Sequence, residues 1–151
     1  MSSRGAHPDD QRLFCSSQLS KLQQAVSDYS WLLQRKYGKK SALILVGDHF
    51  QLEERQRIAV ARCSCSDDSR TRRLSHQIEP AATNELWIDG LNILTTIEVA
   101  LAGGPLLLGR DQSFRDLASW HSNYRLVAQV DRALELIGQA IAGKQAHWLL
   151  D

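Results

Sequence analysis

A run of apolar residues that ends in an aspartate and a glycine constrains the fold most strongly. Residues 85–90 read Glu-Leu-Trp-Ile-Asp-Gly, so three consecutive apolar side chains stand directly before Asp89. A parallel strand that is covered on both faces needs such a continuous run, whereas a strand with one wet face alternates. The run therefore predicts a buried strand over residues 85–89, with Asp89 at its carboxyl end and Gly90 in the turn.

Two more short apolar runs follow this strand, and helical patterns separate them. The runs are PLLLG and HWLL, and we expect strands over residues 105–109 and 147–150. Apolar spacing of three and four predicts helices in between, over residues 92–102, 113–121 and 126–142. The order strand, helix, strand, helices, strand predicts an α/β domain with a parallel sheet of about three strands.

The first half of the chain has helical periodicity. Leu19, Leu22 and Val26 begin a series with spacings of three and four that predicts a helix over residues 18–37. A short apolar run over residues 40–47 and a helical pattern over residues 53–63 follow. These elements predict a small helical domain. It is either a helix-turn-helix unit with Gly47 and Asp48 in its turn or a plain helical bundle.

Composition changes at three places and predicts the domain organisation. Residues 1–17 have no period and predict a flexible arm, and residues 18–63 form the helical domain. Residues 64–84 are polar, contain Pro80 and predict a linker. The α/β domain then occupies residues 85–151.

Charge is distributed unevenly between the two halves. Residues 1–80 carry 13 Lys and Arg against 9 Asp and Glu, whereas residues 81–151 carry 5 against 8. A basic half is expected to approach a phosphate backbone. Arg55 and Arg62 lie seven apart on one face of the helix predicted at 53–63, and Arg72 and Arg73 belong to a basic run in the linker. We take these four arginines as candidate nucleic-acid contacts, and the alternative is that they only face water.

The chain has the features of a cytoplasmic protein. Its first 20 residues are polar and lack the apolar core of a secretory signal. No apolar run approaches the roughly 20 residues that cross a membrane, so we expect no membrane partner. Three cysteines are an odd number and too few for a disulfide framework, so reduced thiols are expected.

An aspartate follows each of the three predicted strands. They are Asp89, Asp111 and Asp151. Binding sites in parallel sheets form outside the carboxyl ends of strands, so these side chains are predicted to share one or two Mg²⁺ or Mn²⁺ ions. Glu98 and Asp116 are positioned to add ligands. The alternative is structural, because aspartate after a strand often only forms a turn or caps a helix.

The stretch IDGLNILTTIEVAL resembles the opening of PIN-like and NYN-type nuclease domains, whose first strand typically ends in Asp-Gly-x-Asn. The chain as a whole is more similar to domain-of-unknown-function family 434, a prokaryotic family, with its attached PIN-like domain. That resemblance covers roughly residues 18–151 and rests on AVSDYSWLL, LVGDHFQLEERQRIAVAR, CSD, GGPLLL and RDQSFRD.

The resemblance implies a three-layer PIN-like fold and a set of site residues. The matching positions are Asp89, Asn92, Thr96, Glu98, Asp111, Arg115 and Asp116. Two positions depart from the pattern, because Arg110 stands where an aspartate is usual and Gln112 replaces a glycine. The 67 residues from Glu85 onward are also too few for a sheet of four or five strands, so we expect an incomplete PIN-like domain.

These observations lead to one main functional hypothesis and two alternatives. The main one is a Mg²⁺- or Mn²⁺-dependent nuclease of PIN-like type that cleaves RNA. Asp89, Asp111, Asp116 and Glu98 would be its catalytic carboxylates, and Asn92, Thr96 and Arg115 would contact substrate. The alternatives are a non-catalytic protein that binds nucleic acid and a homo-oligomeric scaffold.

Overall fold

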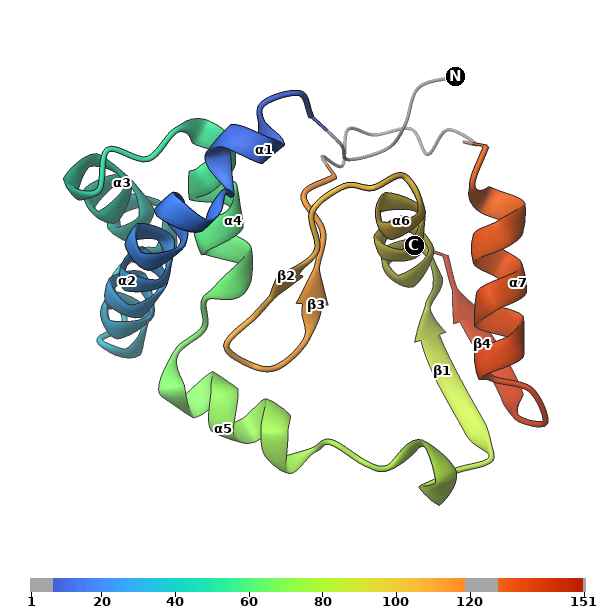
Figure 1. Ribbon diagram of the computed structural model, residues 1–151. Coiled ribbons are helices and arrows are strands. Elements are labelled where there is room, and N and C mark those ends of the chain that lie inside the picture. The colour runs from blue at the N-terminus through green and yellow to red at the C-terminus, as the bar shows by residue number, and fades with distance from the viewer. Residues whose placement is uncertain (1–6, 119–127, 151) are drawn as a thin grey trace.

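A computed structural model describes residues 7–118 and 128–150 of the chain. Figure 1 shows a group of helices on one side, a small α/β unit on the other, a hairpin between them and a helix below the hairpin. The elements in chain order are α1 (Asp10–Leu13), α2 (Ser16–Gln34), α3 (Lys39–His49), α4 (Glu54–Cys63), α5 (Asp67–Ser75), η1 (Pro80–Ala82), β1 (Glu85–Asp89), α6 (Gly90–Leu101), β2 (Leu107–Leu108), β3 (Phe114–Arg115), α7 (Val130–Ala140) and β4 (Gln145–Leu149).

The three helices α2, α3 and α4 pack around one apolar core. Its buried members include Ala25 and Tyr29 on α2 and Ala42 and Val46 on α3, which recur at helical spacing, together with Val60 on α4. The apolar run over residues 40–47 is part of α3, so Gly47 and Asp48 lie inside this helix and not in a turn. The predicted helices at 18–37 and 53–63 are confirmed as α2 and α4 within a few residues at each end.

The predicted arm and the predicted linker both contain helices. Residues 7–15 include α1, and Asp10 in this helix pairs with Arg55 on α4 through bonds of 2.5 and 2.9 Å. The polar segment 64–84 contains α5, which buries none of its residues. Ser66 caps α5 by accepting a hydrogen bond from the Ser69 N–H at 3.2 Å. A helix of this kind has no apolar face, so periodicity could not reveal it.

The α/β unit is built on a two-stranded parallel sheet, and both of its strands were predicted. β1 pairs with β4, and Trp87 lies beside His147 while Ile88 lies beside Trp148. Helices α6 and α7 pack on one another, and Trp148 on the sheet packs against their shared core. On the opposite face Trp87 is 66% exposed and stacks on the His147 ring. The prediction that residues 85–89 are covered on both faces is therefore wrong, because only Ile88 of this strand is buried.

The prediction of a third parallel strand at residues 105–109 is wrong. β2 pairs antiparallel with β3, with Leu107 opposite Arg115 and Leu108 opposite Phe114. Arg110 draws this hairpin toward α4 and α5, because its N–H donates to the Cys63 carbonyl at 2.9 Å and its side chain donates to the Cys65 carbonyl at 2.7 Å. The hairpin is therefore anchored to the helical unit and not to β1.

The hairpin also changes the elements that follow it. The start of the predicted helix at 113–121 is β3 instead, and residues 116–118 are neither helix nor strand. The predicted helix at 126–142 is confirmed as α7 over the shorter range Val130–Ala140, because the described residues 128–129 and 141–142 lie in turns. The sheets of residues 7–118 and 128–150 have two strands each, so this part of the chain forms a mixed α/β structure without the three-layer arrangement expected of a PIN-like domain.

None of the helices in residues 7–118 and 128–150 has the length and apolar character that crossing a membrane requires.

Candidate functional site: a basic cleft between the helices and the α/β unit

Asp89 ends β1 and begins α6, as the strand-end pattern predicts. Its carboxylate caps the helix by accepting from the Asn92 N–H at 3.4 Å and from the Asn92 side-chain amide at 2.5 Å. This is the geometry of an aspartate N-cap, which satisfies an otherwise unpaired N–H of the first helical turn. The side chain of Asp89 remains exposed to solvent. The structure therefore gives it a capping role and leaves it accessible.

Asn92 and Thr96 continue from Asp89 along one face of α6. Residues four apart lie above one another on a helix, and the Thr96 hydroxyl is 2.9 Å from the Asn92 carbonyl oxygen. The same hydroxyl is 2.9 Å from Oδ2 of Asp116. A continuous polar strip thus joins Asp89, Asn92, Thr96 and Asp116, and we call it the α6 strip.

Asp116 connects the α6 strip to the helical unit through Arg62 on α4. Arg62 donates to Oδ1 of Asp116 at 3.1 Å, to the Asp116 carbonyl at 2.6 Å and to the Ala118 carbonyl at 2.8 Å. The Ala118 N–H also donates to Oδ1 of Asp116, at 2.8 Å. Both carboxylate oxygens of Asp116 therefore accept hydrogen bonds, and its side chain is only 12% exposed.

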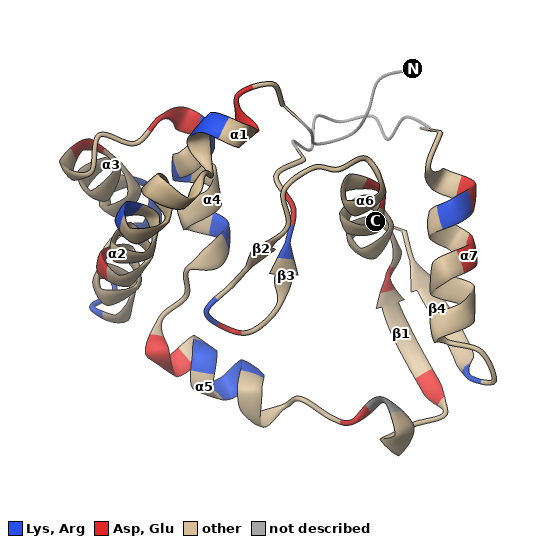
Figure 2. Ribbon diagram, in the orientation of Figure 1, with Lys and Arg blue, Asp and Glu red and all other residues tan. Residues whose placement is uncertain are grey.

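A cleft of about 1040 Å³ opens between α2, α3, α4, α5, α6 and β3. The polar and aromatic side chains that line it are Tyr29, Lys39, Lys40, Arg62, Ser64, Arg73, Asp89, Asn92, Thr96, Phe114, Arg115 and Asp116. Five of these are cations and two are carboxylates, so the described wall of the cleft is basic. Figure 2 shows basic residues on α4, on α5 and on β3 around this region.

Phe114 is the one large aromatic side chain among the described cleft residues that is mainly exposed. It lies on β3 with 63% of its surface accessible, whereas Tyr29 in the same wall is buried. An aromatic ring that stays exposed among cations loses the benefit of apolar burial. Such rings are suited to stack on a ligand that has a flat π-surface.

Asp111 lies in the turn of the hairpin and not at the edge of the parallel sheet. Its Oδ2 accepts from Arg73 at 2.6 Å and from Arg115 at 2.9 Å, and its Oδ1 accepts from the Ser113 N–H at 3.2 Å. Burial of Asp111 opposes its charge, but the Ser113 N–H and the two arginines outweigh burial and lower the pKa of Asp111 below its usual value. Asp111 is thus an ionised carboxylate beneath two arginines.

Seven of the predicted site residues line one cleft, and Asp111 contacts two of them, Arg73 and Arg115. Asp89, Asn92, Thr96, Asp116, Arg115, Arg62 and Arg73 line the one cleft. Glu98 is fully buried on α6, Arg55 pairs with Asp10, and Arg72 is exposed outside the cleft wall. Asp151 lies outside the described residues. The sequence-based prediction missed Lys39, Lys40 and Phe114, because neither periodicity nor a motif connects them with the α6 strip.

The described residues do not gather a metal cluster of the predicted kind. No group of three or more His, Cys, Asp and Glu side chains in residues 7–118 and 128–150 is arranged to hold a metal ion. Asp89 and Asp116 share the cleft, but Asn92, Thr96 and Arg62 already donate to their oxygens. Mg²⁺ is often held by one or two carboxylates together with substrate phosphates, so two carboxylates alone do not complete a site for the ion.

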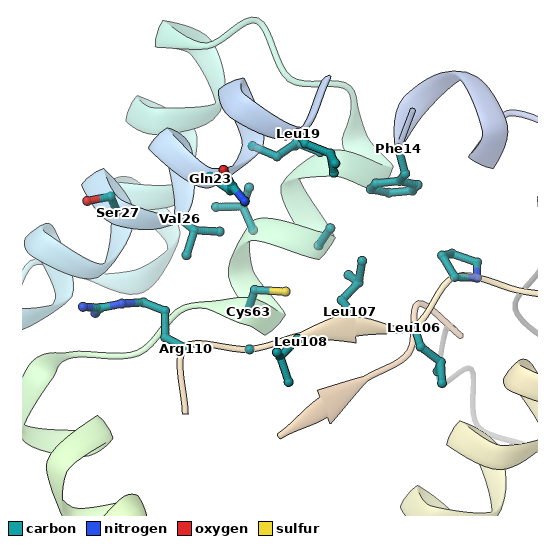
Figure 3. Close-up of a pocket in the computed structure, with 15 residues that line it drawn as sticks. Phe14, Leu19, Gln23, Val26, Ser27, Cys63, Leu106, Leu107, Leu108 and Arg110 are labelled. Carbon is teal, nitrogen blue, oxygen red and sulfur yellow. The ribbon is translucent and has the colours of Figure 1, made fainter. Parts of the chain in front are cut away.

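A second cavity lies on the other side of the hairpin and has a different character. It measures about 630 Å³ between α2, α4 and β2. Figure 3 shows Leu19, Val26 and Leu107 around it, with the Cys63 sulfur directed inward. Burial raises the pKa of the Cys63 thiol to about 11, so the thiol is neutral at ordinary pH. This apolar cavity lacks the basic wall of the cleft.

Comparison with known proteins divides the chain into two matched segments. Residues 21–76 match the family described as a protein of unknown function (DUF434), and residues 78–151 match a domain of unknown function (DUF5616). These matches confirm the resemblance to family 434, and they indicate no PIN-like domain. An uncharacterised protein of Methanocaldococcus jannaschii is 27% identical over 118 residues, which are 77% of this chain and 57% of that protein. The chain therefore spans little more than half the length of this relative. No solved structure matches the chain.

Proposed function

We propose that this protein binds single-stranded RNA in the basic cleft. The observation that carries the proposal is the combination of five cations with the exposed ring of Phe114 in one cleft wall. Proteins that bind single strands combine a positive groove that follows the backbone with aromatic side chains on which bases stack. A cleft built from α2, α3, α4, α5, α6 and β3 supplies both features.

The charge of the cleft determines how this binding responds to salt. Five cations and two carboxylates give the described wall of the cleft a net charge of +3. Neutralising about three phosphates of a single strand gives a slope of roughly −2 for the logarithm of affinity against the logarithm of salt concentration. Affinity should then fall about 20-fold between 50 and 200 mM salt.

The α6 strip supports RNA as the preferred strand. The Asn92 amide and the Thr96 hydroxyl line the cleft beside the cations. Groups of this type can contact a 2′-hydroxyl, which is the feature that distinguishes RNA from DNA. We therefore expect tighter binding of a single RNA strand than of the DNA strand with the same sequence.

Fluorescence anisotropy with a labelled 12-nucleotide RNA tests this proposal. The variant Lys39→Gln/Lys40→Gln removes two exposed cations from the cleft wall, and a salt series measured beside wild type should show weaker binding and a shallower slope. The matched control Lys21→Gln/Arg132→Gln removes two cations from α2 and α7, outside the cleft. Equal losses in both variants would show that general charge, and not the cleft, binds RNA. Absence of wild-type binding at low salt would reject the proposal.

A second candidate function is hydrolysis of the bound strand with Mg²⁺ or Mn²⁺. It is favoured by the position of Asp89 and Asp116 in the same cleft as the cations. A bound phosphate would complete a site that has two protein carboxylates. Such an ion polarises the phosphoryl group and lowers the pKa of a water molecule. Of the four predicted catalytic carboxylates, this candidate needs only Asp89 and Asp116.

Cleavage of end-labelled RNA in the presence of Mn²⁺ tests the second candidate. Asp89→Asn keeps a good helix cap, because asparagine is as favourable as aspartate at this position, so loss of cleavage would report on the charge. Asp131→Asn on α7 is the matched control, since Asp131 is exposed and does not line the cleft. Cleavage that persists in Asp89→Asn would identify a contaminant and exclude this assignment.

A further inference from the structure

We infer that Arg73 and Arg115 form a clamp for one phosphate group of the bound strand and that Asp111 is the residue that positions both arginines. This inference rests on the proposed RNA binding and identifies the point in the cleft where the backbone is held. It changes the role of Asp111, which the strand-end pattern predicted as a metal ligand, to that of a positioning residue.

Solvent exposure distinguishes the positioning residue Asp111 from the two arginines that would bind the phosphate. The side chain of Asp111 is 4% exposed, whereas those of Arg73 and Arg115 are 49% and 37% exposed. Arg73 uses only Nη1 and Arg115 only Nη2 in the hydrogen bonds found among the described residues. A guanidinium has five N–H donors, so each arginine keeps donors for a ligand while Asp111 holds it from below.

The net charge of this group suits a phosphodiester. Two guanidinium groups and one ionised carboxylate carry one positive charge, and a phosphodiester carries one negative charge. Arginine also matches the oxygens of a phosphate with paired N–H donors, which a lysine cannot do. Because Asp111 holds both side chains in place, less conformational entropy is lost when the phosphate binds.

The hairpin turn is shaped to keep Asp111 beneath the arginines. The Gly109 N–H donates to the Ser113 carbonyl at 2.9 Å, which closes the turn around Asp111. A Cβ atom at Gly109 would lie 2.8 Å from Oδ1 of Asp111, which is closer than side chains tolerate. Gln112 adopts a φ of 62°, in the left-handed region. The backbone thus accepts an uncommon conformation in the same turn that holds the carboxylate.

The two arginines come from the two segments that match different families. Arg73 lies on α5 within residues 21–76, and Arg115 lies on β3 within residues 78–151. Arg70 fastens α5 to the turn by donating to the Arg110 carbonyl at 3.1 Å, and Arg110 donates back to Asp67 at 2.8 Å. The clamp therefore forms only when the two segments pack together. This requirement is a physical reason for the two matched domains to stand in one chain.

The RNA affinity of the Asp111→Asn variant tests this inference. Removal of a negative charge and loss of positioning predict changes in affinity of opposite sign. The substitution removes a negative charge beside the cleft, so electrostatics alone predicts tighter binding. Loss of positioning predicts binding about five-fold weaker or more, since two long side chains must then be ordered by the RNA itself. Asp131→Asn on α7 is the control with the same change in charge.

Two further variants keep the inference testable if Asp111→Asn does not fold, as checked by circular dichroism. Arg73→Lys and Arg115→Lys retain the charge but lose the paired donors, and each should weaken binding about five-fold or more. Wild-type affinity in both lysine variants, or affinity equal to or tighter than wild type in folded Asp111→Asn, would overturn the clamp. RNA binding that still depends on Lys39 and Lys40 would then leave the proposed function intact, whereas absence of binding by the wild type would reject both.

Discussion

Replacement of Arg62 by methionine should destabilise the protein strongly, because this side chain joins the helical unit to the α/β unit. Arg62 makes three hydrogen bonds to Asp116 and Ala118, two of them to backbone carbonyls, at 2.6, 3.1 and 2.8 Å. Its side chain is 30% exposed and that of Asp116 is 12% exposed. Methionine retains most of the apolar stem and removes every donor.

The expected loss follows from these contacts. A net hydrogen bond contributes about 0.5–1.5 kcal/mol, and one to a charged group contributes up to about 3 kcal/mol. Water can reach part of the gap, which reduces the sum, so we expect the free energy of unfolding to fall by about 2–4 kcal/mol. The exposed pair Arg132–Glu135 on α7, with side chains 58% and 61% exposed, provides the contrast. Arg132→Met should cost less than about 1 kcal/mol.

Urea denaturation followed by tryptophan fluorescence and far-ultraviolet circular dichroism measures both variants. A double-mutant cycle with Asp116→Asn should give a coupling energy of about 0.5–3 kcal/mol, because the two side chains are in direct contact. If Arg62→Met costs no more than Arg132→Met, the reasoning that Arg62 holds the two units together is refuted.

Four further predictions follow from individual contacts. Asp89→Ala should lower the free energy of unfolding by about 0.5–2 kcal/mol through loss of the α6 cap, whereas Asp89→Asn should change it little by the same measurement. Phe114→Ala should weaken RNA binding about 5- to 100-fold in anisotropy titrations, and its urea midpoint should stay near wild type because the ring is 63% exposed. Burial raises the pKa of Cys63 to about 11, so mass spectrometry should find Cys63 alkylated by iodoacetamide at pH 8 more slowly than Cys15, whose pKa is lowered. Burial opposes the charge of Asp111, but its donors outweigh burial and lower its pKa, so its stabilisation is complete above about pH 4 and is lost as pH falls through the lower folded-state pKa. Acid titration of Asp111→Asn should therefore show a shallower fall in stability than wild type.

Local patterns predicted the elements that have a continuous apolar face. The helices α2, α4, α6 and α7 have such a face and all are present, and β1 was predicted from its run of three apolar residues. The strand β4 was also predicted from its apolar residues, and it pairs with β1 in the structure. In these elements burial of apolar side chains decides the local conformation, and burial leaves a period in the sequence.

The elements that polar contacts hold in place could not be predicted in this way. α5 has no buried residue, so it gave no periodic signal. The hairpin of β2 and β3 depends on Arg110 and Asp111, whose partners Cys65 and Arg73 lie about 40 residues earlier in the chain. The position of Asp111 after an apolar run suggested a place in the sheet, but these long-range bonds direct it to α5.

The candidate site was predicted in part. The family resemblance implied Asn92, Thr96 and Asp116 as site residues, and in the structure the Thr96 hydroxyl lies 2.9 Å from both the Asn92 carbonyl oxygen and Oδ2 of Asp116. Lys39, Lys40 and Phe114 complete the cleft only because α3 and β3 meet there. No spacing within the sequence predicts a contact of that kind.

Crosslinking of the protein to a single RNA strand tests directly whether the strand lies in the basic cleft. A 12-nucleotide RNA that contains 4-thiouridine, irradiated in complex with the full chain, would be followed by identification of the crosslinked peptides by mass spectrometry. We expect crosslinks at Phe114 and in the peptides that contain Lys39, Lys40 and Arg73, all of which line the cleft. Crosslinks confined to α7 or β4, or none above a control without irradiation, would contradict it.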